Sequence, residues 1–321
     1  MENKYFFENK YFMELINKKK VYYGRRKIFM VSYEWNKTIK IRNDVMSRLS
    51  EFRKSHDFLV CADSDGCVMD VMDAKHEKCF APCFIESFQL NHRCTEAYET
   101  WLKINLYSKT RGINRMKACL LTLKALKVDI EGLEIFEDFC NNSNELSNRA
   151  IEEYLKVKDN LCMRTVLQWS EDTNKEIKKL SDQGSPFKYA YEALKTSSNY
   201  ADIVAVSSAN RMALEHEWEK HGFSEFVGGL FSQEEGSKAY CIKELLNKGY
   251  DKSKVIMIGD APGDIKAAEE NGVWCFPIIV GKEAESWKKF SDEVLPALVD
   301  GKLTKEIQES WIEEYYSVLD N

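Results

Sequence analysis

Two carboxylates, one residue apart, directly follow an apolar run of strand length. The run Phe58-Leu59-Val60-Cys61-Ala62 leads straight into Asp63-Ser64-Asp65-Gly66. A buried strand ending here would carry both aspartates into one crevice, where unpaired carboxylates cost several kcal/mol each, roughly, unless a divalent cation holds them. Gly66 lets the backbone turn away sharply after the strand. The stretch therefore indicates that Asp63 is a nucleophile or metal ligand and that Asp65 is an acid/base.

Further polar side chains follow later apolar runs. They are the hydroxyls of Ser207 and Ser208, the amine of Lys238, and the carboxylates of Asp260 and Asp264. Magnesium prefers hard oxygen ligands and accepts a substrate phosphate oxygen. A phosphoryl group in transfer needs its negative charge offset by a metal, a lysine, and hydroxyl or backbone N–H donors. Together these residues supply every group that Mg²⁺-assisted phosphoryl transfer requires.

Strand-like and helical patterns alternate in the second half of the chain. Strands are predicted at 203–206, 226–231, 255–258 and 273–279, and helices at 210–221, 237–248 and 263–271. This alternation predicts a parallel sheet covered by helices on both faces. Ligands of such sheets bind beyond the carboxyl ends of the strands. Asp63, Asp65, Ser207 and Asp260 are therefore expected to converge on one crevice.

The segment between the first and second predicted strands is helical almost throughout, from about residue 71 to 198. Asn141-Asn142-Ser143-Asn144 is predicted to interrupt it and to cap the helix that follows. A second break at 181–186 is predicted to return the chain to the sheet. A further helix is predicted at 35–56, ahead of the first strand. No function is inferred for residues 1–30.

Composition argues against nucleic-acid and membrane partners. The net charge is −6, and the charged residues, 31% of the chain, are mixed in sign. Nucleic-acid-binding proteins usually carry clustered basic residues. No apolar run is long enough to cross a bilayer and no secretory signal is visible, so a cytoplasmic protein is expected. The ten cysteines are expected to be reduced, and the group His76, Cys79, Cys83, His92 and Cys94 matches no closed zinc pattern.

In this order, the motifs resemble those of the haloacid dehalogenase superfamily of phosphohydrolases. The matching stretches are Asp63-Ser64-Asp65-Gly66, Val206-Ser207, Lys238 and Gly259-Asp260-Ala261-Pro262-Gly263-Asp264. The resemblance implies a Rossmann-like, three-layer α/β fold with a parallel sheet and an inserted α-helical cap. Residues 35–72 and 184–321 would form the core, 73–183 the cap, and 1–34 an N-terminal arm.

The resemblance also implies a role for each motif residue. Asp63 would attack phosphorus and become an aspartyl phosphate, while Asp65 would protonate the leaving group and then activate water. The Mg²⁺ site would be formed by Asp63, the backbone carbonyl of Asp65, Asp260 and Asp264. The remaining roles are phosphoryl binding by Ser207 or Ser208 and Lys238, and orientation of Lys238 or a metal-bound water by Asp264. The family more often has threonine at the position of Cys67, which would support the turn.

The predicted cap is expected to choose the substrate by closing over the crevice. Its candidate contacts are Lys75, His76, Lys109, Arg111 and Arg115. The expected substrate is a small phosphorylated metabolite, such as a sugar phosphate or a phosphoglycolate-like acid. Two alternatives remain open: a phosphomutase of the β-phosphoglucomutase type, and a non-catalytic regulatory or ligand-binding protein that uses the same fold.

Overall fold

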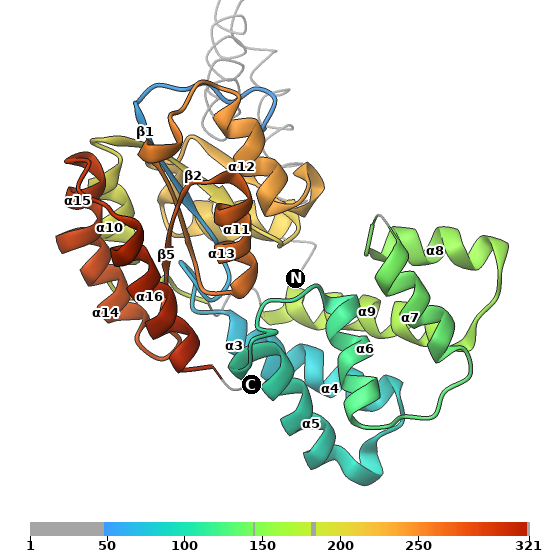
Figure 1. Cartoon of the computed structure of the whole chain (residues 1–321). Coiled ribbons are helices and arrows are strands. Elements are labelled where there is room, and N and C mark those ends of the chain that lie inside the picture. The colour runs from blue at the N-terminus through green and yellow to red at the C-terminus, as the bar shows by residue number, and fades with distance from the viewer. Residues whose placement is uncertain (1–47, 144, 181–183, 320–321) are drawn as a thin grey trace, which may run out of the picture. The chain divides into compact units, whose positions relative to one another are not determined.

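Five parallel strands form the predicted sheet, in the order β3-β2-β1-β4-β5. The computed structural model describes residues 48–143, 145–180 and 184–319 (Figure 1). The strands are β1 (Phe58–Ala62), β2 (Ala201–Val206), β3 (Gly229–Phe231), β4 (Val255–Gly259) and β5 (Trp274–Pro277). Ala62 lies opposite Ala205 of β2 and Ile258 of β4, so the residues that follow all three strands emerge at one edge. The predicted parallel α/β fold is confirmed.

The central strands are apolar because both of their faces are covered. Every residue of β2 and β4 is buried, as are four of the five residues of β1. Such near-continuous apolar runs are typical of parallel strands between two helical layers. Helices α10 (Ala190–Ser197) and α12 (Lys238–Leu246) both contact β2, and α13 (Pro262–Asn271) contacts β4. The sheet is therefore a rigid support for the loops at its carboxyl edge.

Helices make up most of the rest of the described chain. Between β1 and β2 they are α3 (Met72–Lys75), α4 (Ala81–Ser87), α5 (Cys94–Leu102), α6 (Arg115–Ala125), α7 (Leu133–Asn142), α8 (Asn148–Val157), α9 (Leu161–Leu180) and α10. After β2 they are α11 (Arg211–Lys220), α12, α13, α14 (Glu283–Lys289), α15 (Leu295–Val299) and α16 (Lys305–Ser317). In the described part of the chain, no helix is long and apolar enough to cross a membrane.

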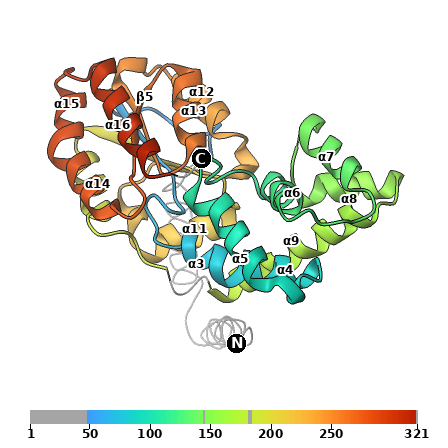
Figure 2. The same ribbon diagram turned by 60° about the horizontal axis from the view of Figure 1, so that its bottom comes forward.

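The inserted helices have a hydrophobic core of their own. Trp101, Phe136 and Trp169 belong to one buried cluster that draws on helices α4 to α9. A second cluster joins the strands to α12, α13 and α16. Helices α4 to α9 also lie together in both views of the ribbon (Figures 1 and 2). Two separate cores support the proposal that residues 73–183 are a cap, distinct from the core at 35–72 and 184–321.

Two local predictions need correction. The residues of the predicted 35–56 helix that are described, 48–56, form a turn and then irregular chain rather than a helix. Residues 141–144 were predicted to cap the next helix, but Asn142 is the last residue of α7. The next helix, α8, is capped by Ser147, whose Oγ accepts from the Ala150 N–H at 3.2 Å. The predicted arm, residues 1–34, lies outside the described residues.

A buried aspartate fixes the edge of the sheet opposite the predicted site. Asp202, near the start of β2, accepts hydrogen bonds from the backbone N–H groups of Ser55 (2.8 Å) and His56 (2.9 Å), and from the hydroxyls of Ser55 and Tyr250. Burial by itself raises the pKa of Asp202, but these hydrogen bonds outweigh it and lower the pKa below its ordinary value. The ionised carboxylate therefore ties the segment before β1 to β2.

Replacing Asp202 by Asn should destabilise the fold at pH 7 by about 3 kcal/mol, because donors that face the carboxylate would lose their acceptor. A carboxyl whose folded-state pKa is depressed stabilises the fold above its unfolded pKa of about 3.9 and loses this contribution as the pH falls through the folded-state value. The gap between wild type and Asp202→Asn in urea unfolding should therefore narrow below about pH 4. A gap that is constant or widens on acidification would contradict this account.

Candidate active site

Asp63 lies immediately beyond β1 with both carboxylate oxygens engaged. Oδ1 accepts from the backbone N–H of Ser64 at 2.7 Å, and Oδ2 is 2.6 Å from Nζ of Lys238. Its own backbone N–H donates to the carbonyl of Ile258 at 2.9 Å, which extends the pairing of β1 with β4 by one residue. The sheet therefore fixes both the position and the orientation of the predicted nucleophile.

Lys238 pairs with two carboxylates from different segments, Asp63 after β1 and Asp264 in the first turn of α13. It is the first residue of α12, whose N-cap is Ser237, and its Nζ is also 2.5 Å from Oδ1 of Asp264. Burial opposes the charge of this ammonium, but Asp264 and Asp63 raise the pKa of Lys238 well above its ordinary value. Lys238 is therefore a permanent cation next to the predicted nucleophile.

Asp260 follows β4 and is only 1% exposed. Its Oδ2 accepts from Nη2 (2.7 Å) and Nε (2.9 Å) of Arg111, which comes from the segment between β1 and β2. Its backbone carbonyl accepts from Nε of Arg111 at 3.0 Å and from the hydroxyl of Tyr315 at 2.8 Å. Oδ1 of Asp260 is buried and has no hydrogen-bond partner. One oxygen is thus held by an arginine, while the other remains available.

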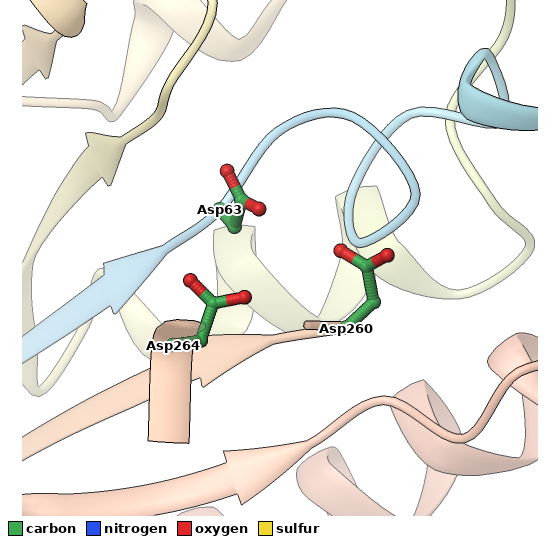
Figure 3. Close-up of side chains that lie close together, drawn as sticks. All are labelled: Asp63, Asp260 and Asp264. Carbon is green, nitrogen blue, oxygen red and sulfur yellow. The ribbon is translucent and has the colours of Figure 1, made fainter. Parts of the chain in front are cut away.

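Within the described residues, one group of possible metal ligands gathers: Asp63, Asp260 and Asp264 each offer an oxygen within 4.8 Å of the others. Figure 3 shows these three carboxylates close together, with Asp63 and Asp260 just beyond strand ends and Asp264 on the helix that follows Asp260. Burial raises the pKa of both Asp260 and Asp264, and the negative charge of Asp63 raises them further, although Arg111 and Lys238 oppose the shift. When all three carboxylates are ionised, they exceed the two cations, Arg111 and Lys238, by one charge.

The donor set fits a hard divalent cation such as Mg²⁺. Its ligands would be carboxylate oxygens, which Mg²⁺ prefers, and the buried Oδ1 of Asp260 lacks any other partner. A buried acceptor left unpaired is costly, so a cation at this point would relieve an existing penalty. Asp63 and Asp260 would offer side-chain oxygens from the two strand ends. Asp264, which is held by Lys238 and accepts the Ala261 N–H at 3.1 Å, offers a third oxygen in the same group.

The turn after Asp63 is held by buried hydrogen bonds. The carbonyl of Ser64 accepts from the N–H groups of Val68 (2.9 Å) and Met69 (2.8 Å). Gly66 adopts φ +83°, and a Cβ there would lie 2.4 Å from Oδ2 of Asp260, so a larger residue would displace that carboxylate. Cys67 is buried inside the turn, and burial raises the pKa of its thiol, so it remains a neutral packing group.

The side chain of Asp65 pairs with a lysine of α3, in the segment between β1 and β2. Its Oδ2 is 2.7 Å from Nζ of Lys75 on α3, and the same amine is 3.1 Å from Oε1 of Glu217 on α11. Asp65 therefore does not share the Lys238 cluster of Asp63. The two aspartates of the motif therefore have separate cationic partners, Lys238 for Asp63 and Lys75 for Asp65.

The two serines after β2 differ in burial. Ser207 is buried, donates its backbone N–H to the carbonyl of Phe231 at 2.8 Å, and accepts the Ala209 N–H on Oγ at 3.1 Å. Ser208 is exposed. Because Ala205 pairs with Ala62, Ser207 lies level with the turn that follows Asp63. This placement favours Ser207 over Ser208 as the phosphoryl-binding hydroxyl.

The five candidate cap residues have different surroundings. Lys75 and Arg111 reach the aspartates of the core, as described above. His76 accepts the indole N–H of Trp101 at 3.0 Å, and burial followed by nearby cations lowers the pKa of His76 to about 3. Arg115 donates to Ser170 (3.1 Å) and Asn174 (2.7 Å) within the inserted helices, and Lys109 is exposed on its loop. The structure therefore brings two of the five to the carboxylates.

Several residues that position the site were not predicted from the sequence. Trp218 donates to the Ser64 hydroxyl at 3.0 Å, and Trp287 donates to the carbonyl of Cys67 at 2.8 Å. Glu217 and Tyr315 make the contacts given above. A tryptophan in an amphipathic helix carries no sign of which loop it will reach. Only the placement of α11 after the second motif could have pointed to Glu217 and Trp218.

A cavity of about 270 Å³ opens beside the turn that follows Asp63. Its walls are Gly66, Asp70, Met72, Asp73, Tyr107, Arg111, Phe187, Val280, Gly281 and Glu283. Gly66 and Arg111 both contact Asp260, so this cavity borders the carboxylate cluster from the side of the turn.

The model of the haloacid dehalogenase-like hydrolase family matches residues 87–278, more than half of the chain. The chain belongs to this family. The match includes Ser207, Lys238, Asp260 and Asp264 of this haloacid dehalogenase-like hydrolase, and it begins after Asp63-Ser64-Asp65-Gly66. The proposed roles of Asp63 and Asp65 therefore rest on their geometry. No curated protein matches the chain.

Solved structures of low sequence identity are also similar to this hydrolase. A haloacid dehalogenase-like family hydrolase from Streptococcus pneumoniae is 14% identical, with 72% of this chain and 90% of that chain covered and a TM-score of 0.44. A candidate phosphoglycolate phosphatase from Lactobacillus delbrueckii subsp. bulgaricus is 15% identical, with coverages of 78% and 100% and a TM-score of 0.46. A haloacid dehalogenase-like family hydrolase from Xanthomonas campestris is 12% identical, with coverages of 78% and 99% and a TM-score of 0.45.

The close packing of the Arg111 loop against the loop of Asp260 can be tested with glycine variants. Gly112 has φ +68°, and an added Cβ would lie 2.6 Å from Cβ of Ala261, whereas Gly301 has φ +66° with nothing within 4 Å. Both alanine variants bear the backbone strain, but only Gly112→Ala overpacks a contact, so it should lose about 1–3 kcal/mol more than Gly301→Ala in urea unfolding. Equal losses would show that the two loops do not pack as described.

Proposed function

We propose that this hydrolase is a Mg²⁺-dependent phosphomonoesterase that acts on a small phosphorylated metabolite through an aspartyl phosphate at Asp63. The observation that carries the proposal is the setting of Asp63: a rigid carboxylate at a strand end, beside Lys238 and two further buried carboxylates. Phosphoryl transfer needs a fixed nucleophile and a high local density of compensating positive charge. The family assignment supports the hydrolytic class of reaction.

In the first step, a carboxylate oxygen of Asp63 bonds to phosphorus while the bond from phosphorus to the ester oxygen breaks. Protonated Asp65 gives its proton to the departing oxygen, so the leaving group departs as a neutral alcohol. Lys238, 2.6 Å from Asp63, holds the attacking carboxylate in place and offsets the charge on the phosphoryl oxygens. Ser207 supplies a hydroxyl donor at the same edge of the sheet.

In the second step, water attacks phosphorus and its proton passes to the carboxylate of Asp65. The bond from Asp63 to phosphorus breaks, which releases inorganic phosphate and regenerates both aspartates. When bound at Asp63 and Asp260, Mg²⁺ would supply positive charge against the phosphoryl oxygens. Arg111 pairs with Oδ2 of Asp260, which leaves the buried Oδ1 without a partner, and Mg²⁺ would supply one.

The proposal predicts that wild-type protein with Mg²⁺ releases phosphate from members of a panel of metabolite phosphates, and that Asp63→Asn lowers the rate by about 10³-fold or more. The matched control is Asp129→Asn, a change at an exposed aspartate in the connection between α6 and α7, which should retain full activity. Phosphate release is measured directly, and products are separated to detect an isomerised sugar phosphate.

No phosphate release from any ester, together with unchanged ligand binding by Asp63→Asn, would contradict the enzymatic proposal. Conversion of a sugar 1-phosphate to its isomer without release of free phosphate would show that the activity is that of a phosphomutase. Full activity of Asp63→Asn would remove Asp63 as the nucleophile.

A metal titration tests the role of Asp260. Asp260→Asn should raise the Mg²⁺ concentration required for half-maximal activity by about 100-fold, because it removes charge and a ligand oxygen from the cluster. Calorimetric Mg²⁺ binding should weaken in parallel. Asp251→Asn, which changes the cap of the turn before β4, is the control. Unaltered Mg²⁺ binding by Asp260→Asn would place the metal elsewhere.

A further inference from the structure

The amine of Lys75 is buried between two carboxylates at the junction of the inserted helices and the sheet domain. Its side chain is 8% exposed, and its Nζ is 2.7 Å from Oδ2 of Asp65 and 3.1 Å from Oε1 of Glu217. Lys75 belongs to α3, directly after the first motif, whereas Glu217 belongs to α11, beyond β2. Three segments far apart in the sequence therefore meet at one ammonium group.

Each carboxylate of this triad has one oxygen engaged and one unpartnered. Oδ2 of Asp65 and Oε1 of Glu217 contact Lys75, while Oδ1 of Asp65 and Oε2 of Glu217 are buried and lack a hydrogen-bond partner. By contrast, both oxygens of Asp63 are engaged. A buried oxygen without a partner is costly unless another molecule completes it. Oδ1 of Asp65 is thus the oxygen of this carboxylate that no group of the described protein engages.

We propose that Lys75 is a positioning residue for proton transfer: it holds Oδ2 of Asp65, so that Oδ1 carries the proton to the leaving group and later receives one from water. Glu217 holds Lys75 from the opposite side and fixes the amine in this position. The inference rests on the proposed function, which assigns Asp65 as the acid/base. It differs from a substrate contact by Lys75, because the ammonium is already shared by two carboxylates.

The environment of Lys75 also excludes a nucleophilic amine. Burial disfavours its charge, but Asp65 and Glu217 outweigh burial and raise the pKa of Lys75 above its ordinary value. The amine therefore stays protonated and cannot form a covalent adduct with a carbonyl substrate. Neither proton moves to or from Lys75 in the scheme: Oδ1–H of Asp65 passes to the ester oxygen, and a water proton restores it.

The test uses two aryl phosphates of similar size but different leaving groups. Nitrophenolate departs readily without a proton, whereas phenolate from phenyl phosphate depends more on general acid catalysis. Lys75→Met should lower kcat/KM for phenyl phosphate by about 100-fold and for 4-nitrophenyl phosphate by less than about tenfold, since general acid catalysis contributes about 10²–10⁴-fold. Glu217→Gln should give a smaller change of the same kind, and Lys75→Arg should restore part of it.

A burst measurement supplies the second readout. With 4-nitrophenyl phosphate, Lys75→Met should release nitrophenol in a burst followed by a slow steady rate, because Asp65 also activates water for the second step. Lys78→Met, at an exposed lysine on the same segment, is the control and should behave as wild type. Urea unfolding of each variant reports whether it is folded.

The outcomes separate this inference from the proposed function. Equal losses of kcat/KM for both esters would mean that Lys75 is merely structural, and higher activity of Lys75→Met would mean that Lys75 restrains Asp65; either result overturns the inference while the phosphatase stands. If Lys75→Met does not fold, the same comparison of kcat/KM for phenyl phosphate and 4-nitrophenyl phosphate is made with Glu217→Gln and Lys75→Arg. Wild-type protein that hydrolyses neither ester nor any metabolite phosphate would remove the proposed function, and the inference with it.

Discussion

The need to balance negative charge in a buried place governs this molecule. Parallel strands deliver Asp63 and Asp260 to one edge of the sheet, and the first turn of α13 adds Asp264, all three buried. Such a group is stable only if cations come close, and here Lys238 and Arg111 do so with distances of 2.5–2.7 Å. When all three carboxylates are ionised, one net negative charge remains, and a further cation would balance it. Structure and proposed chemistry thus share one electrostatic requirement.

The same requirement ties the inserted helices to the sheet domain. Arg111 and Lys75 both come from the chain between β1 and β2, and each meets an aspartate that follows a strand. The Arg111–Asp260 pair is buried on both sides, so breaking it would leave an uncompensated charge, a loss that costs several kcal/mol, roughly. In the second pair Lys75 is buried beside a partly exposed Asp65, so the loss there is smaller. Whatever alters the charge at Asp260 or Asp65, such as a bound metal or phosphate ester, therefore also acts on the contacts that hold the inserted helices.

The sequence was informative where a general rule of folding applied. Apolar runs and the parallel-sheet rule predicted that Asp63 and Asp260 would meet, because strand carboxyl ends share an edge. The sequence did not predict which group a long side chain contacts. Arg111 was expected to contact substrate, but its pairing with Asp260 was not predicted. Glu217 was not predicted either, since one sequence does not reveal which face of α11 is directed toward Lys75. Such choices depend on packing between distant segments, which periodicity does not encode.

The central claim is that Asp63 becomes covalently phosphorylated, and chemical trapping tests it most directly. Protein mixed with 4-nitrophenyl phosphate and Mg²⁺ is quenched in acid during turnover and treated with borohydride, which reduces an aspartyl phosphate to homoserine. Peptide mass spectrometry should then find homoserine at position 63, dependent on substrate. Phosphate release without homoserine at position 63, or with homoserine at another aspartate, would contradict the account.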